Sequence, residues 1–203
     1  MMTSNMLDIH KDIHEKLQYF INKKKIPNII FHGESGCGKR TILYQFISNI
    51  YENNVKKMNE FSMFVECAHG KGIKFIREEL KFFAKTNIST NAGHNFKCVV
   101  LLNADKLTTD AQSALRRCIE LYNHTTRFFI IVEDKYKLLR PILSRFCEIY
   151  VYRPIICGKP TNLCKHVIEE TFNTKNFKSL RLDWLKKELL NTPFSQKKIL
   201  ELS

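Results

Sequence analysis

The sequence predicts an α/β domain with a five-stranded parallel sheet covered by helices. Five short apolar runs alternate with segments in which apolar residues recur at helical spacing. The runs are apolar throughout rather than alternating with polar residues, as is typical of strands buried on both faces. A glycine-rich stretch directly after the first run has the spacing of a phosphate-binding loop, which connects a buried strand to a helix.

The elements of the first half of the chain follow from this spacing. After the glycine-rich stretch, Ile42, Phe46 and Ile50 recur every four residues and share one face of a helix. The expected elements are a helix over 7–22, a strand over 26–31, a helix over 41–50, a strand over 61–67, a helix over 71–83 and a loop over 86–95.

The second half continues the alternation and then changes character. We expect strands over 97–102, 127–132 and 147–152, a helix over 109–122 and a short helix over 135–143. After Pro154 only helical patterns recur, over 161–172 and 182–190. The chain is therefore expected to divide into a main domain, 1–153, and a small helical segment, 154–203.

Composition limits the classes of function. The chain has 203 residues, and its longest apolar stretches have strand length, so neither a signal peptide nor a membrane span is expected. Seven cysteines without metal-ligand spacing predict neither a disulfide framework nor a structural metal, and favour a reducing intracellular compartment. The formal net charge of +13 is spread along the chain and favours an anionic partner, although it is also compatible with simple solubility.

The glycine-rich stretch is the strongest motif. Gly33, four residues, and then Gly38-Lys39 is the spacing with which backbone N–H groups and a lysine hold phosphates. The next residue is normally Ser or Thr, whose hydroxyl binds Mg²⁺, and here it is Arg40. The expected nucleotide-binding residues are Gly33, Glu34, Ser35, Gly36, Cys37, Gly38, Lys39, Arg40 and Thr41.

A second nucleotide signature is incomplete. Proteins that hydrolyse nucleotides hold Mg²⁺ with a carboxylate at the end of a neighbouring strand, usually followed by an acid that orients water. At the end of the strand over 97–102 these two positions are Leu102 and Asn103, and Asp105 follows three residues after Leu102. We therefore expect nucleotide binding without hydrolysis. His10, His32 and His94 lie in no catalytic motif and are expected to be ordinary packing or surface residues.

Three segments resemble the small subunits of replication factor C, the sliding-clamp loader of the AAA+ family. The segment 107–117 is nearly identical to the family's helix after the second nucleotide signature, 141–146 resembles its Ser-Arg-Cys segment, and 70–84 resembles its DNA-facing helix. The resemblance covers about residues 7–155 and is strongest to the subunit type with a degenerate nucleotide site. It implies an AAA+ P-loop domain followed by a partial helical lid.

The resemblance also implies ligands and partners. These are ATP or ADP, with or without Mg²⁺, together with other clamp-loader subunits, the sliding clamp and primer-template DNA. Arg145 corresponds to an arginine finger that reaches a neighbour's nucleotide, and Lys71, Lys74 and Arg77 correspond to DNA contacts. Arg116 and Arg117 are adjacent in a helix and point in different directions, and one of them is expected to serve an interface or DNA.

Departures from the family pattern bear on function. Glu133 stands where the family places an asparagine that senses the γ-phosphate, Phe146 replaces a cysteine, and the tryptophan-containing opening is absent. By this resemblance, the chain is also expected to lack the collar that joins clamp-loader subunits into a ring. The preferred hypothesis is a non-hydrolysing subunit at the site of DNA replication, in a nucleus or a viral factory. The alternatives are a self-sufficient DNA-dependent ATPase and an interaction protein with a vestigial site.

Overall fold

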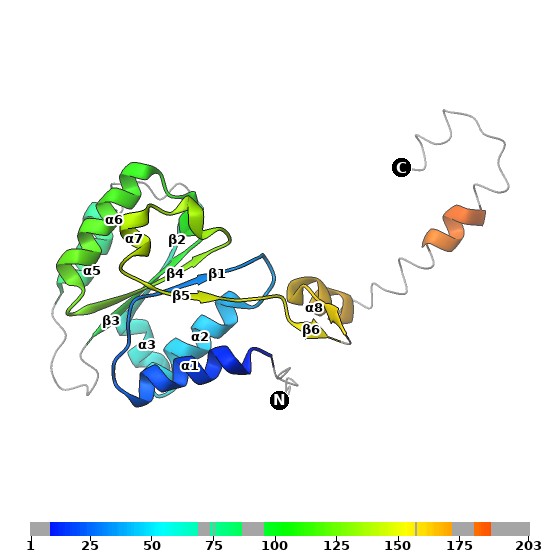
Figure 1. Cartoon of the computed structure of the whole chain (residues 1–203), viewed down its shortest axis with the longest axis horizontal. Coiled ribbons are helices and arrows are strands. Elements are labelled where there is room, and N and C mark those ends of the chain that lie inside the picture. Colours follow the sequence, from blue (N-terminus) through cyan, green and yellow to red (C-terminus); the bar gives the residue numbers. More distant parts are fainter. Residues whose placement is uncertain are drawn as a thin grey trace.

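A computed structural model describes residues 9–68, 74, 76–86, 96–156, 158–171 and 181–187. Its centre is a five-stranded sheet with the strand order β2-β3-β4-β1-β5, in which every neighbouring pair is parallel. This confirms the predicted fold class and places the first strand between the last two (Figure 1). The strands are β1 (Ile29–His32), β2 (Ser62–Glu66), β3 (Lys97–Leu102), β4 (Thr126–Val132) and β5 (Cys147–Tyr150).

Helices cover both faces of the sheet, because side chains alternate between the faces along each strand. In β1, Ile29 and Phe31 pack with α1, α2 and α3, whereas Ile30 packs on the opposite side with α5, α6 and α7. Figure 1 shows these two layers on either side of the strands. The helices are α1 (Lys11–Asn22), α2 (Lys39–Ile50), α3 (Val55–Phe61), α5 (Lys81–Lys85), α6 (Thr109–Tyr122) and α7 (Arg140–Leu143).

Several predicted boundaries need correction. The helix expected over 41–50 begins two residues earlier, because Gly38 takes a left-handed conformation that starts the helix at Lys39. The helix α3 was not predicted, although the Asn54 side chain caps it by accepting bonds from the amides of Lys56 and Lys57. Its seven residues are too few to show clear periodicity in the sequence.

Two predicted helices are also divided differently. The described part of the helix expected over 71–83 contains a π-helical turn, η1 (Ile76–Leu80), followed by α5. The helix expected over 135–143 is a 3₁₀ turn, η3 (Lys135–Lys137), and then α7. Pro141 explains the second case: it has no N–H and is best tolerated in the first turn of a helix, so α7 begins beside it.

A hairpin that the sequence analysis missed follows the sheet. The strands β6 (Ile155–Ile156) and β7 (Lys159–Pro160) pair antiparallel, and Gly158 supplies a positive φ between them. Next comes α8 (Leu163–Thr171), within the helix expected over 161–172, and residues 181–187 form a further helical segment. None of the helices in the described parts of the chain has the length and apolarity needed to cross a membrane.

Candidate nucleotide-binding site

The phosphate-binding loop connects the carboxyl end of β1 to the amino end of α2. Gly33, Gly36 and Gly38 all have φ values between +77° and +147°, a region that residues with side chains rarely adopt. At Gly33 a Cβ atom would lie 2.2 Å from the carbonyl oxygen of Val151, which leaves no room for one. Only glycine fits this close approach, so the spacing found in the sequence reflects a real constraint on the backbone.

Lys39 points back into the loop rather than outward from α2. Its ammonium group donates to the carbonyl oxygens of Gly33 at 2.6 Å and Glu34 at 2.7 Å, and the residue is only 8% exposed. The Cys37 thiol donates to the same Glu34 carbonyl at 2.8 Å, and burial raises the pKa of that thiol. The loop therefore encloses one positive charge beside the start of a helix, where backbone N–H groups favour anions.

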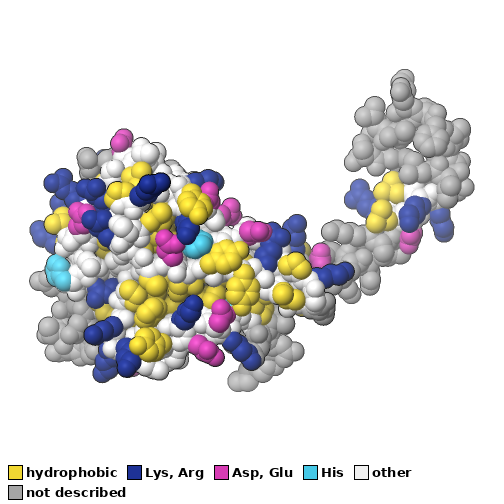
Figure 2. Space-filling view, viewed as in Figure 1, with side chains coloured by type: hydrophobic (Ala, Val, Ile, Leu, Met, Phe, Trp, Pro, Cys, Tyr) yellow, Lys and Arg dark blue, Asp and Glu magenta, His cyan; other side chains and the backbone are white. Residues whose placement is uncertain are grey.

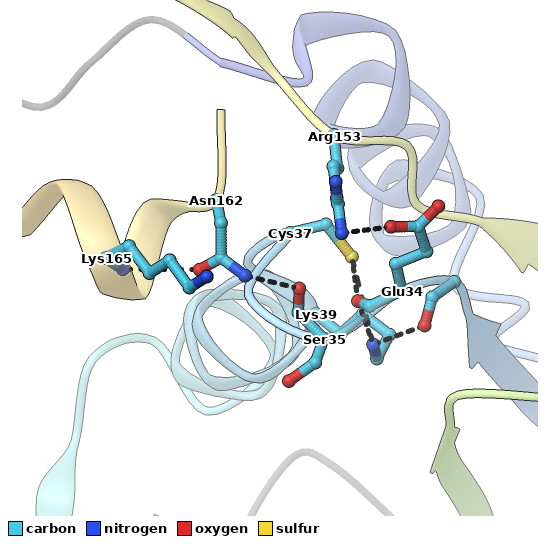
Figure 3. A network of polar contacts seen from close by, with 8 residues as sticks. Glu34, Ser35, Cys37, Lys39, Arg153, Asn162 and Lys165 are labelled. Carbon is cyan, nitrogen blue, oxygen red and sulfur yellow. Dashed lines mark hydrogen bonds and ion pairs between the residues drawn. The ribbon is translucent and has the colours of Figure 1, made fainter. Parts of the chain in front are cut away.

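The outer side of the loop contacts two distant segments, and Figure 3 shows the one that carries Asn162. From the segment after the hairpin, the Asn162 side-chain amide donates to the carbonyl oxygen of Ser35 at 3.0 Å. The backbone N–H of Leu163 donates to the carbonyl oxygen of Gly36 at 2.7 Å. From the amino-terminal side, His10 Nε2 bonds the carbonyl of Cys37 at 2.9 Å. Three consecutive carbonyls of the loop are thus occupied.

Arg40 and Thr41, the residues after the loop lysine, are both exposed in the first turn of α2. Arg40 occupies the position of the usual Mg²⁺-binding hydroxyl. Thr41 lies one helical step further, which rotates it by about 100°. Near the loop, His32 at the end of β1 is partly buried, and that burial together with Lys135 lowers its pKa.

The carboxyl ends of β3 and β4 lie on the same side of the sheet as the loop. Leu102 is buried and offers no ligand for a metal, and the Asn103 amide donates to the Glu66 carboxylate at 2.7 Å. Glu66 ends β2, three strands from β1, or roughly 14 Å at the usual strand spacing. Glu133 follows β4 and is exposed. Among the described residues, no group of three or more His, Cys, Asp or Glu side chains could hold a metal ion.

Arg145 and this chain's own loop lie at opposite ends of the parallel strands. It precedes the amino end of β5, whereas the loop follows the carboxyl end of β1, and these strands run parallel in register from Ile29–Cys147 to His32–Tyr150. The exposed guanidinium of Arg145 bonds the Glu120 carboxylate at 2.6 Å and the Pro141 carbonyl at 2.5 Å. Both of these bonds are within the chain, and the guanidinium remains partly exposed to solvent.

The remaining predicted site residues are scattered. Arg116 and Arg117 are exposed on α6, and Arg116 lies 3.5 Å from Glu120, beside Arg145. Lys74 is exposed, whereas Lys71 and the side chain of Arg77 lie outside the described residues. On the face seen in Figure 2, Lys and Arg side chains are spread over the sheet domain among fewer acidic ones.

Some residues around the site were missed from the sequence. His10 was expected to be an ordinary packing or surface residue, and the structure buries it against the loop, a contact that the sequence did not indicate. Asn162 lies inside the helix expected over 161–172, but α8 begins after it, and its Oδ1 accepts the amide of Lys165. Asn is a typical residue at the start of a helix, so the capping role of Asn162 could have been read from the sequence. Its second bond, to Ser35, joins residues 127 positions apart and left no local signal.

Comparisons with known proteins agree on one family. A scan against family models finds no match. The replication factor C small subunit of Sulfolobus acidocaldarius is 38% identical over 135 residues, covering 66% of this chain and 40% of that protein. That of Methanoculleus marisnigri is 38% identical over 149 residues, covering 71% and 43%. Replication factor C subunit 3 of Blastobotrys adeninivorans is 34% identical over 161 residues, covering 79% and 46%. The chain thus spans less than half of each relative.

Solved structures agree at the level of the fold. A DNA polymerase III gamma subunit-related protein from Thermotoga maritima matches with a TM-score of 0.56 and 20% identity, over 68% of this chain and 45% of that one. A RuvB variant from the same organism matches with a TM-score of 0.51 and 12% identity, over 72% and 47%. The sheet order, the phosphate-binding loop and the sequence matches therefore place this chain, an AAA+ domain over most of its length, in the replication factor C small-subunit family.

Proposed function

We propose that this chain is a clamp-loader subunit of the replication factor C type that binds a nucleotide without hydrolysing it. One observation carries the proposal: the loop keeps its glycine geometry and its inward-pointing lysine, while the positions for metal and water activation hold other side chains. In this role the chain acts at the site of DNA replication within a multi-subunit ATPase. Its neighbours supply the hydrolysis.

The loop residues fit the phosphates of ATP or ADP. The glycines at positive φ turn successive backbone N–H groups toward one side of the loop, and Lys39 adds a positive charge there. Hydrolysis additionally needs a held metal and a positioned water. Leu102 has no polar atom in its side chain, and Asn103 is hydrogen-bonded to Glu66, which supports binding without turnover. Glu133 adds a negative charge after β4, where it would oppose a γ-phosphate.

The direct test measures nucleotide binding and turnover on the same purified chain. We expect saturable binding of ADP or ATP and no turnover above that of a blank. Turnover that disappears in Lys39→Ala would identify a self-sufficient ATPase instead. Absence of both binding and turnover would favour an interaction protein with a vestigial site.

Binding is expected to be independent of Mg²⁺, because an arginine, Arg40, replaces the residue whose hydroxyl normally binds the metal. Arg40→Ser should lower affinity for ADP in EDTA by roughly 10- to 100-fold, the usual range for the loss of one hydrogen bond to a charged group. It should also make that affinity respond to added Mg²⁺. Titrations of ADP with and without EDTA check both effects.

A matched control is Lys56→Ser, which removes an exposed cation from α3. It should leave affinity for ADP unchanged, so that a loss seen only with Arg40→Ser is attributable to its place beside the loop. If the unaltered chain lost its binding of ADP in EDTA, the proposed role of Arg40 would be contradicted.

DNA contact is proposed for the basic segment before and within η1. Replacing Lys71, Lys74 and Arg77 together with alanine should weaken binding to primer-template DNA. The slope of log K against log salt should fall by about 2–3, because each phosphate contact contributes roughly 0.9. Fluorescence anisotropy at several salt concentrations measures this slope.

The triple variant has a control of equal charge. Lys23, Lys24 and Lys25 are exposed between α1 and β1, and replacing all three with alanine removes the same charge elsewhere. The control should change the salt slope by less than one. Equal losses from both triple variants would mean that net charge, rather than this segment, governs binding.

A further inference from the structure

The contacts on the outer side of the loop come from parts of the chain that no nucleotide motif includes. Ser35, Gly36 and Cys37 are consecutive, and their carbonyl oxygens accept bonds from Asn162, Leu163 and His10 respectively. An ion pair between Arg153 and the Glu34 carboxylate adds a fourth link from the segment that precedes the hairpin. Figure 3 shows Asn162 and Arg153 approaching the loop from different directions.

These contacts use carbonyl oxygens of the loop and none of its N–H groups, which are the groups that hold an anion in a phosphate-binding loop. Positive φ values at Gly36 and Gly38 bring backbone N–H groups toward one side, so the carbonyls between them face the other side. A carbonyl that accepts a hydrogen bond also polarises the peptide group to which it belongs, which strengthens the neighbouring N–H as a donor. Bonds to the carbonyls therefore favour the conformation that binds phosphate.

The approach of the Asn162 side chain to the loop is very close. A Cβ atom at Gly36 would lie 2.0 Å from Asn162 Oδ1 and 2.4 Å from its Nδ2. Gly36 thus meets two requirements at once, the φ of +77° and the space for Asn162. At Gly38 the nearest atom to such a Cβ is Leu163 Cδ1, at 3.2 Å. The first turn of α8 is fitted against two of the three glycines of the motif.

We propose that Asn162 and the first turn of α8 form a latch that holds the phosphate-binding loop in its binding conformation, with Asn162 as its positioning residue. This inference rests on the nucleotide binding proposed above. Because coupling between two sites is reciprocal, a nucleotide in the loop also strengthens the docking of α8. A bound nucleotide would then change how firmly α8 is held, and with it any contact that α8 makes with a partner.

The two bonds of Asn162 allow the latch to be separated from helix capping. Its Oδ1 accepts the amide of Lys165 at 3.2 Å and caps α8, whereas its Nδ2 donates to Ser35. Asn162→Ser keeps a capping oxygen but lacks the length to reach Ser35. Thr161→Ala is the matched control, since the Thr161 hydroxyl bonds the Lys159 carbonyl and not the loop.

The experiment titrates ADP into the full chain and follows hydrogen exchange of the Leu163 amide. Asn162→Ser should bind ADP about 3- to 10-fold more weakly than the parent, as expected for the loss of one hydrogen bond. Thr161→Ala should bind like the parent. In the parent ADP should slow exchange of the Leu163 amide, and in Asn162→Ser this protection should be reduced. Loss of a cap alone would not remove a response to ADP.

The outcomes are distinguishable. Equal affinity for ADP in the parent and Asn162→Ser overturns the latch while the proposed nucleotide binding stands. Tighter binding in Asn162→Ser also overturns it, because α8 would then obstruct the loop. A parent that binds no ADP contradicts the nucleotide binding and, with it, the coupling.

Discussion

Arg145→Ala, assembled with its partner subunits, should lower ATP turnover at the neighbouring site by about 10³-fold or more, the usual contribution of an arginine finger. The physical reason is charge: a guanidinium stabilises the negative charge that develops as the γ-phosphoryl group leaves. Arg145 precedes the amino end of β5, whereas its own loop follows the carboxyl end of β1, so the proposed role requires the nucleotide of another subunit. Steady-state turnover of the reconstituted complex measures the effect.

Two further variants sharpen this test. Arg140→Ala removes an exposed arginine from α7, five residues before Arg145, and should leave turnover near the parental rate. Arg145→Lys should not restore activity, since an ammonium group lacks the planar fork that binds phosphate oxygens. A complex with Arg145→Ala that turns over at the parental rate would show that the arginine has another role.

Lys39→Ala should lower affinity for ADP by roughly 10- to 100-fold, because hydrogen bonds to charged groups contribute about 1.5–3 kcal/mol. Lys39 is buried within the loop and bonds two of its carbonyls, so it both attracts phosphate and shapes the loop. Titration with ADP measures the loss. Added salt should lower the ADP affinity of the parent less than it would at a site with exposed charges, because buried charges are weakly screened.

A change in folding must be separated from a change in binding. Removing Lys39 leaves the carbonyl of Gly33 without this partner, so thermal unfolding of the ligand-free variant should be compared with that of the parent. Lys39→Met keeps much of the buried stem and should lose ADP affinity to a similar degree while retaining more stability. Parental affinity in both variants would place the nucleotide elsewhere.

Much of the sheet domain could be predicted because its signals are local. The strand β3 and the helix α6 have the predicted bounds, since a continuous apolar run and a regular helical stripe each occupy one unbroken stretch of sequence. The loop was found for the same reason: its glycines and lysine follow one another at a fixed spacing. Short elements such as α3 and the β6–β7 hairpin were missed because they contain too few residues for periodicity to appear.

The residues around the loop likewise fall into those that a local sequence pattern indicates and those that only packing brings together. The chemistry of the cradle, including the replacement at Arg40, can be read from consecutive positions. The order of the strands, the place of Arg145 at the far edge and the contacts of His10 and Asn162 with the loop arise only when distant segments pack together. The hydrogen bond between Asn162 and Ser35, which are 127 positions apart, depends on how the backbone folds, and no local pattern of residue types indicates it. Local sequence therefore specified what the loop can bind, and tertiary packing decided what holds it and which groups it can reach.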